Sequence, residues 1–195
     1  MKPIKLIILV LILASCKGKK DAAENLAAEE QELKKYVGFY EIISFKSDIA
    51  VDLNGDGISS YELLGEFKDY DFYFKDLEIS YYPKNSAKLI SFLIPRTALT
   101  FIGPDEPSVQ FAKYAFITKY TQEEGAIRLT ENTFVVEDYI DNLKRTWTIT
   151  FGEQITLVDA NHLKATVAKE YYDLKDKRWK LLHIDILYER KYIEQ

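Results

Sequence analysis

The chain has 195 residues, a length that suits one ordinary domain together with a leader. Hydrophobic residues make up 47% and charged residues 29%, so a substantial core can form and wholesale disorder is excluded. The net charge of −5 argues against nucleic-acid binding. One cysteine excludes an internal disulfide and a cysteine-based zinc site, and two histidines leave little for histidine-based catalysis.

Residues 1–15 have the three-part layout of a secretory signal peptide. Lys2 and Lys5 give a positive start, and an unbroken apolar run follows from Leu6 to Ala14. That run is too short to span a bilayer as a helix. We therefore expect residues 1–15 to be removed from the mature protein.

The leader ends in Leu13-Ala14-Ser15-Cys16, which resembles the lipobox of bacterial lipoproteins. The resemblance implies cleavage before Cys16, attachment of a diacylglycerol to its thiol and acylation of the new amine. Three acyl chains on one residue would hold the protein at a membrane almost permanently. In that family an Asp after the cysteine retains a lipoprotein in the inner membrane; Lys17 stands here, so we expect the outer membrane. The alternative is an ordinary secretory signal followed by an incidental free cysteine.

Residues 16–35 are expected to form a lipidated tether. The part from Asp21 to Lys35 is rich in Ala, Glu and Lys and lacks Pro and Gly, which predicts an exposed helix. This helix is interpreted as a tether or a lid.

From Tyr36 onward, β-branched and aromatic residues alternate with short turn clusters, a pattern typical of strands. Thr146–Phe151 is the clearest case, with large apolar residues on one face and threonines on the other. Further strands are expected at Val37–Lys46, Phe67–Phe74, Leu77–Tyr82, Lys88–Ile94, Ala98–Ile102, Gln110–Thr121, Ala126–Thr130, Thr133–Tyr139, Gln154–Val158, Leu163–Tyr172 and Lys180–Tyr192. Short strands without intervening helices favour an antiparallel meander, and closure removes its exposed edges. We predict an all-β, mainly antiparallel, up-and-down barrel over residues 36–195 as one domain.

The segment Tyr36-Val37-Gly38-Phe39-Tyr40 opens the first strand after the helical lead-in. Lipocalin-type barrels begin similarly, with a Gly-x-Trp element, and place an arginine from a late strand over the tryptophan. Here Tyr40 stands in place of the tryptophan, and Arg190 is the matching late arginine. The chain thus resembles the lipocalin-like lipoproteins of bacterial cell envelopes. The alternative is that Gly38 is a strand kink and Tyr40 a core aromatic.

The loop from Asp52 to Glu62 resembles the calcium loops of EF-hand and dockerin proteins. Asp and Asn side chains at alternate positions can converge their oxygens on one hard cation. The resemblance implies a structural calcium ion held by Asp52, Asn54, Asp56, the carbonyl of Ile58 and Glu62. Glu62 stands one position earlier than the closing acid of those loops.

The same segment also has a second interpretation. Ser59-Ser60-Tyr61-Glu62 fits a capping box, which predicts a short helix from Ser60 to Phe67. The residues before it, Asn54-Gly55-Asp56-Gly57, are of types that are common in turns.

No catalytic constellation is apparent. His183 and Asp185 share one strand face without a third partner, His162 is remote, and no nucleotide-binding or nucleophile motif is present. We therefore predict that the protein is not an enzyme. It is expected to bind a small amphiphilic ligand in an internal pocket lined by Tyr and Phe. The alternative is an accessory subunit of an outer-membrane assembly, with a filled barrel and an exposed aromatic patch. The residues that would contact a ligand are not predicted.

Overall fold

The computed structural model describes residues 28–73, 75–103, 106–123, 125–140 and 143–191. Residues 28–33 are helical, and the chain divides into two units between Tyr36 and Val37. The signal peptide, Cys16 and most of the tether lie outside the described residues, so cleavage and lipidation stay predictions. Among the described residues, no helix is long and apolar enough to cross a bilayer.

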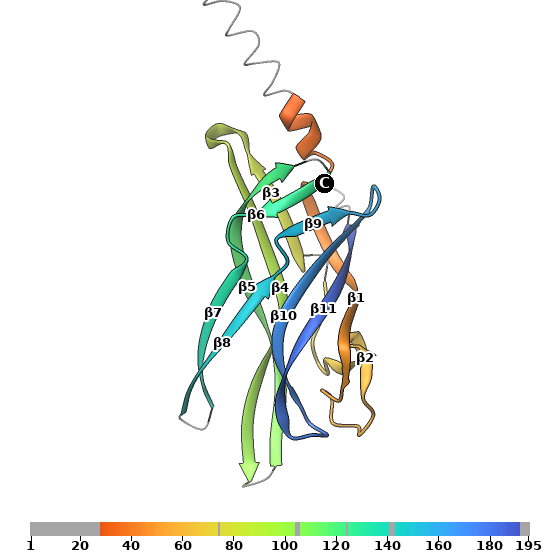
Figure 1. The fold of residues 1–195 in the computed structure, drawn as a ribbon, viewed down its shortest axis with the longest axis vertical. Helices are drawn as coiled ribbons and strands as arrows, with labels where there is room; N and C mark the ends of the chain where they lie inside the picture. The colour runs from red at the N-terminus through yellow and green to blue at the C-terminus, as the bar shows by residue number, and fades with distance from the viewer. Residues whose placement is uncertain (1–27, 74, 104–105, 124, 141–142, 192–195) are drawn as a thin grey trace, which may run out of the picture. The chain divides into compact units, whose positions relative to one another are not determined.

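Beyond Val37 the chain is built almost entirely of strands (Figure 1). In chain order these are β1 (Gly38–Val51), β2 (Ser60–Glu62), β3 (Leu77–Tyr82), β4 (Ala87–Gly103), β5 (Glu106–Glu123), β6 (Ala126–Leu129), β7 (Thr133–Ile140), β8 (Leu143–Phe151), β9 (Gln154–Leu157), β10 (His162–Asp173) and β11 (Arg178–Lys191). Two 3₁₀ turns, Leu64–Glu66 and Pro83–Asn85, lie between them.

The strands close into an eight-stranded antiparallel barrel. Neighbours follow the order β11-β1-β3-β4-β5-β6-β9-β10, and β10 pairs with β11 along its whole length to complete the ring. The predicted all-β, lipocalin-like barrel is therefore confirmed. Closure gives each of these strands a paired neighbour on both sides, so the ring has no outer strand of the kind that forms each edge of an open sheet.

The β7–β8 hairpin is attached to this ring only at one end of β8. β8 pairs with β10 only at Phe151 and Thr150, opposite Val167 and Ala168, and then runs away from β10 (Figure 1). Gly152 lies where β8 gives way to β9, and its amide donates to the carbonyl of Thr166 at 2.8 Å. A Cβ at Gly152 would lie too close to the Thr166 hydroxyl in its present position, so any larger residue requires that side chain to shift.

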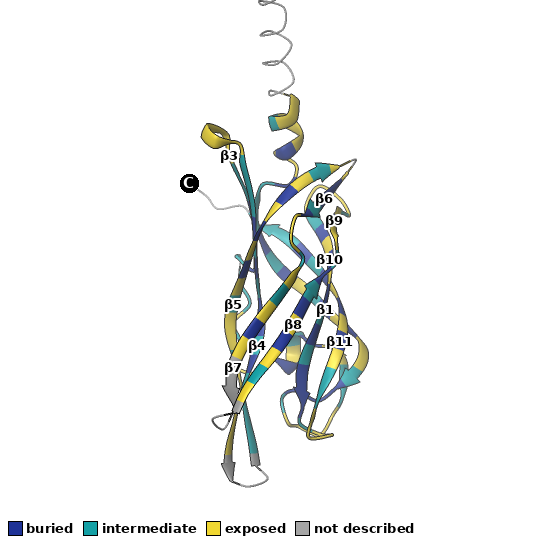
Figure 2. Ribbon diagram, turned by 60° about the vertical axis from the view of Figure 1, so that its left-hand side comes forward, coloured by how far each residue is buried: buried dark blue, intermediate teal, exposed yellow. Residues whose placement is uncertain are grey.

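Aromatic rings pack the interior. The ring of Phe151 stacks on that of Phe92 at 4.2 Å between centroids, and Phe116 and Phe134 lie within 5.9 Å of Phe151. These rings point inward because buried and exposed residues alternate along strands such as β8, as Figure 2 shows. This alternation places one face of each strand in the core.

The structure brings together the two residues that the lipocalin resemblance singled out. Arg190 donates from Nε and Nη2 to the hydroxyl of Tyr40, at 3.1 and 2.7 Å. Its guanidinium carbon lies 5.3 Å from the centre of the Tyr40 ring. Gly38, with φ of +156°, lies beneath, and a Cβ there would be 3.6 Å from Arg190 Nε. The contact expected from the motif is present.

Two predicted strands in the middle of the chain are both strand in the structure, but the break predicted between them is wrong. Lys88–Ile94 and Ala98–Ile102 are parts of one continuous strand, β4, which passes through Pro95. Leu93 donates its N–H to the carbonyl of Asp76, and the next residue facing that side is Pro95. β3 begins only at Leu77, opposite Phe92, so on the β3 side no described strand lies beside Pro95. The missing N–H of Pro95 points to that side and therefore costs no hydrogen bond between strands.

The expected strand Phe67–Phe74 is not one over its described residues, 67–73. Its rings serve packing instead. Phe67 lies 5.5 Å from Phe45, 4.9 Å from Phe111 and 5.3 Å from Tyr171, measured between ring centroids. The segment thus fills one end of the interior.

The expected helix from Ser60 to Phe67 is also wrong. Ser60–Glu62 pairs with β1 as the short strand β2, and only the turn Leu64–Glu66 is helical, of the 3₁₀ type. The backbone of Leu63 donates to the carbonyl of Phe45 at 2.9 Å. The backbone groups of residues 60–63 therefore form their hydrogen bonds with β1, and not with one another as they would in a helix.

Candidate functional site: the lysine cavity

The alternation of β10 directs an amine into the barrel. Leu163, Ala165, Val167 and Tyr171 are buried on one face, and Lys169 lies on the same face with only 4% of its surface exposed. Buried lysines are rare because removing an ammonium from water is costly. The sequence pattern of β10 already contained this signal, but we assigned no role to Lys169 from it.

Lys169 has few polar partners. Its Nζ donates to the carbonyl of Glu170 at 3.3 Å and lies 3.6 Å from the centre of the Tyr171 ring. Burial, followed by the positive charge of Arg96, lowers the pKa of Lys169 to about 7, while Glu170 acts in the opposite direction. The amine is thus poised between its neutral and charged forms near neutral pH.

A small cavity adjoins this amine; we call it the lysine cavity. Its volume is about 20 Å³, which is room for one water-sized group. It is lined by Arg96 and Thr97 of β4, Val136 of β7, Trp147 and Ile149 of β8, Lys169 and Glu170 of β10, and Trp179 of β11. The cavity exists because β8 leaves β10 below Thr150, so side chains rather than backbone bonds close the wall there.

Two further polar groups of this lining are buried without a partner. The Oγ1 of Thr97 and the Nε1 of Trp147 make no hydrogen bond, although these residues are only 3% and 7% exposed. Trp147 Nε1 can only donate, and the Thr97 hydroxyl can donate too. Unsatisfied buried donors are costly, so each such group calls for an explanation.

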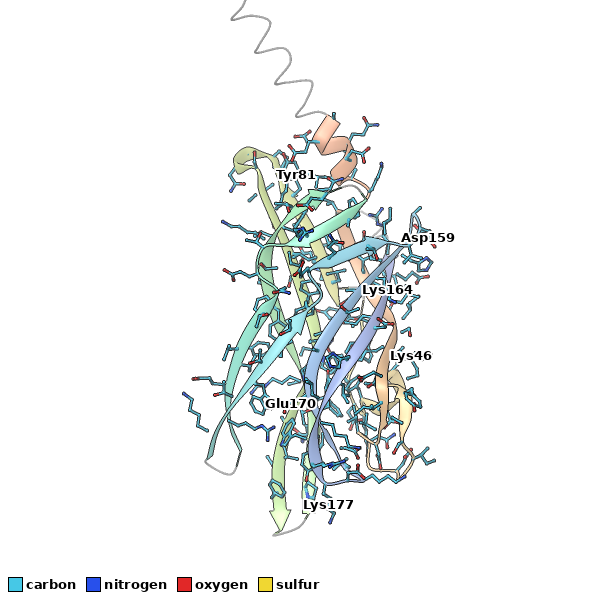
Figure 3. All side chains as sticks on the ribbon, in the orientation of Figure 1. Lys46, Tyr81, Asp159, Lys164, Glu170 and Lys177 are labelled. Carbon is cyan, nitrogen blue, oxygen red and sulfur yellow. The ribbon has the colours of Figure 1, made fainter. Side chains whose placement is uncertain are left out.

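Arg145 lies over the two tryptophans that line the cavity. The rings of Trp147 and Trp179 lie 5.5 Å apart, and the Arg145 guanidinium lies 4.2 Å from the centre of the Trp179 ring. Arg145 Nη2 also binds the carboxylate of Glu170 at 3.0 Å. Figure 3 labels Glu170 on the part of β10 from which β8 has already diverged. The lining therefore combines the flat apolar surface of two tryptophans with charged groups of both signs.

The predicted calcium loop is held by its own side chains. Asp52 Oδ1 and Oδ2 accept hydrogen bonds from the amides of Gly55 and Gly57, at 2.7 and 2.8 Å. Asn54 Oδ1 accepts from the amide of Asp56, and Asp56 Oδ1 from that of Ile58. Three of the predicted ligands are thus gathered on one loop.

Glu62, the fifth predicted ligand, points elsewhere. Its Oε1 and Oε2 accept hydrogen bonds from the amide of Phe45 and the hydroxyl of Ser44, both at 2.8 Å. The carboxylate that reaches the loop is Glu66, which accepts from the amide of Leu53 at 2.9 Å. Burial raises the pKa of Glu66. Glu66 is a residue that sequence reasoning missed.

Within the part of the chain that the structure describes, no three His, Cys, Asp or Glu side chains are grouped as a metal site. The loop offers carboxylate and amide oxygens of the kind that calcium prefers, but not the predicted closing acid. Calcium binding stays a prediction.

The weaker candidates do not meet. Asp185 pairs with Lys164 at 3.1 Å, and His162 Nδ1 lies 2.8 Å from the carboxylate of Asp159. His183 is exposed, and its amide donates to Asp48. These residues form separate surface contacts.

A second buried polar group lies inside the barrel around Asp76. Its Oδ2 accepts from the amides of Ile42 and Tyr73 at 3.2 and 3.1 Å, while its Oδ1 has no partner. The hydroxyls of Tyr70 and Tyr188 are likewise buried without partners. Burial raises the pKa of Asp76 to about 7. Asp76, Tyr70 and Tyr188 thus form a buried polar cluster built around a carboxyl group, whereas the lysine cavity is built around an amine.

No protein-family model matches the chain, and neither a curated protein nor a solved structure matches it. Its function is therefore inferred from its own residues.

Proposed function

We propose that this protein is a lipid-anchored protein of the cell envelope whose barrel binds a small amphiphilic ligand at the lysine cavity. The observation that carries the proposal is the pair of unpartnered donors, Trp147 Nε1 and Thr97 Oγ1, beside the buried amine of Lys169. A ligand with an acceptor head would satisfy these groups. Binding sites typically combine a mostly apolar lining with a few convergent polar groups, as here.

The apolar part of such a ligand would lie against the tryptophans. Trp147 and Trp179 offer two rings at 5.5 Å, and Val136 and Ile149 continue the apolar lining. The cavity holds only one water-sized group, so the ligand's tail must run outward along these rings or displace them. Since β8 is bound to β10 at only two residue pairs, the β7–β8 hairpin is the part of the wall that can yield.

The lipobox-like segment at Leu13–Cys16 supports the envelope location, and the calcium-type loop at Asp52–Glu62 supports a structural ion in an extracytoplasmic protein. With a leader removed before Cys16, a lipid anchor would hold the barrel at the outer membrane. Its partners would then be the membrane, through the lipid, and the bound amphiphile.

Native mass spectrometry of the full-length protein extracted from membranes tests this function. We expect a mass that reports cleavage and acylation at Cys16, together with an adduct released as a small amphiphile on unfolding. A protein with an unmodified thiol that carries no adduct, and that binds no added amphiphile, would contradict the proposal.

A second function is favoured by the filled interior. Stacking of Phe92 on Phe151, and packing of Phe67 between β1, β5 and β10, leave aromatic rings where an internal pocket lined by Tyr and Phe was expected. A filled barrel suits an accessory subunit of an outer-membrane assembly. Extraction of the protein in a stable complex with an envelope protein, without any small adduct, would favour this function over ligand binding.

A further inference from the structure

We infer that the ligand of the lysine cavity is an aldehyde, and that the amine of Lys169 holds it as an imine. This inference rests on the proposed function: it names the chemical class of the amphiphile, a single-chain aldehyde, and the atom that binds its head. The bond that forms joins Lys169 Nζ to the carbonyl carbon, and water reverses it.

The amine of Lys169 is available as a nucleophile. Only 4% of the residue is exposed, and its Nζ contacts the carbonyl of Glu170 at 3.3 Å and the centre of the Tyr171 ring at 3.6 Å. In the described part of the chain no carboxylate pairs with this amine, and the carboxylate of Glu170 is bound by Arg145. Burial is the largest cause that lowers the pKa of Lys169 to about 7, so much of the amine is neutral at neutral pH. A neutral lysine in an apolar site is the form that attacks carbonyl carbons.

The space beside the amine selects the head. About 20 Å³ admits one water-sized group. A carboxylate or a phosphate brings two or more oxygens, and acyl transfer to the amine would leave a carbonyl oxygen there. An aldehyde leaves only its carbon, because its oxygen departs as water. A ketone would leave a second carbon branch where an aldehyde has a hydrogen. The aldehyde is therefore the carbonyl head whose product suits this space, and its tail follows the rings of Trp147 and Trp179.

Thr97 and Trp147 can assist the reaction, because their unpartnered donors line the same cavity. The carbonyl oxygen of the arriving aldehyde is an acceptor for the Thr97 hydroxyl and the Trp147 N–H. A hydrogen bond to that oxygen draws electrons from the carbon and stabilises the charge that develops on oxygen during attack. The two donors thus act before the oxygen leaves.

The reaction balances without an oxidant or a reductant. The lone pair of the Lys169 amine forms the nitrogen–carbon bond, the π electrons of the carbonyl move to oxygen, and one amine proton passes to that oxygen. The carbon–oxygen bond then breaks, and the nitrogen lone pair forms the double bond. The oxygen leaves as water with the second amine proton.

Reductive trapping identifies the lysine that forms an imine. The full-length protein in phosphatidylcholine nanodiscs, whose lipids carry no primary amine, is mixed with octanal and sodium cyanoborohydride at about pH 7. The reductant converts an imine into a stable secondary amine, so peptide mass spectrometry finds an octyl group on the lysine that reacted. We expect Lys169 to be labelled about tenfold or more faster than any other lysine, because an ordinary lysine, with a pKa of 10.5, is almost wholly protonated there.

Lys169→Met, matched with Lys164→Met, tests the same point on the intact protein. Lys164 lies on the same strand but is exposed and pairs with Asp185 at 3.1 Å (Figure 3). We expect Lys169→Met to abolish the rapid addition of one octyl group and Lys164→Met to keep it. Thr97→Val, which keeps the side-chain shape and removes the hydroxyl, should slow the labelling of Lys169 by about tenfold or more.

Octanol separates the imine from the binding function, since it has the same tail and an acceptor oxygen but forms no imine. The chain has 2 tryptophans, Trp147 and Trp179, and both line the cavity, so tryptophan fluorescence, with empty nanodiscs as blanks, reports binding there. We expect octanol to bind and to slow the labelling of Lys169. Octanol binding while octanal labels Lys169 no faster than other lysines would overturn this inference and leave the amphiphile-binding function standing. Absence of both octanol binding and labelling of Lys169 would overturn both.

Discussion

The hydroxyl of Tyr171 donates a hydrogen bond of 2.7 Å to the carbonyl of Pro95, joining β10 to β4 across the barrel. Both residues are buried. Pro95 lies on the stretch of β4 that β3 does not cover, so a side chain from the opposite wall satisfies a backbone acceptor there. Tyr171 lies two residues after Lys169 on β10, so this bond ties β10 to β4 close to the lysine cavity.

Tyr171→Phe is expected to lower the free energy of unfolding by about 1–2 kcal/mol, because the carbonyl of Pro95 loses its donor while the ring packing stays. Urea denaturation measures the change. Unchanged stability would mean that another donor replaces the hydroxyl.

The buried amine makes stability rise with pH above neutrality. The pKa of Lys169 is about 7 in the folded protein, below the 10.5 of an ordinary lysine, so the unfolded chain binds more protons between these values. As the pH falls from about 10 to 7, this site should remove up to about 1.4 kcal/mol of stability per pH unit. Lys169→Met should abolish that slope in thermal melts, whereas Lys164→Met should keep it.

Asp76 has the opposite effect. Its folded pKa of about 7 lies above the ordinary value of 3.8, so the folded protein binds more protons between these values. Stability from this site is complete at acidic pH and is lost as the pH rises through about 7. Asp76→Asn should flatten this loss and melt at a higher temperature than the wild type at alkaline pH. An unchanged pH profile would show that Asp76 is not the group responsible.

Lys180 neutralises a buried carboxylate at the β10–β11 turn. Asp173 is 1% exposed, its Oδ2 lies 2.5 Å from Lys180 Nζ, and its Oδ1 accepts from the amides of Lys175 and Asp176. Lys180→Met leaves that charge buried without its partner and should cost about 3 kcal/mol in urea denaturation. Lys177→Met in the same exposed turn serves as the control and should change little. A loss for both variants would point to the turn rather than to the ion pair.

Calcium should raise the melting temperature of the wild type if the loop binds it. Asp56→Ala removes one predicted ligand while Asp52, which holds the loop amides, stays in place. We expect this variant to lose the calcium-dependent rise, and Glu62→Gln to keep it, because Glu62 faces β1. Wild-type melts that are identical with calcium and with chelator would contradict the site.

Most strands were predictable, and the reason is visible in β8. Trp147, Ile149 and Phe151 alternate with threonines, and burial follows that alternation in the structure. Tyr40 and Arg190 meet as the motif suggested. Prediction failed where distant segments decide the local structure. The expected strands Lys88–Ile94 and Ala98–Ile102 are one strand, because β3 does not cover the edge at Pro95 and its missing N–H costs no bond there. The aromatic rings of residues 67–73 pack into the interior without forming a strand.

The sequence by itself determined most of the strands and which of their faces point inward, because a side-chain period of two is a local property of the backbone. Only the tertiary structure decided that β8 parts from β10 and that Arg96, Thr97 and Trp147 line one cavity with Lys169. Which strand lies beside which depends on hydrogen bonds between distant segments, and local alternation carries no information about them.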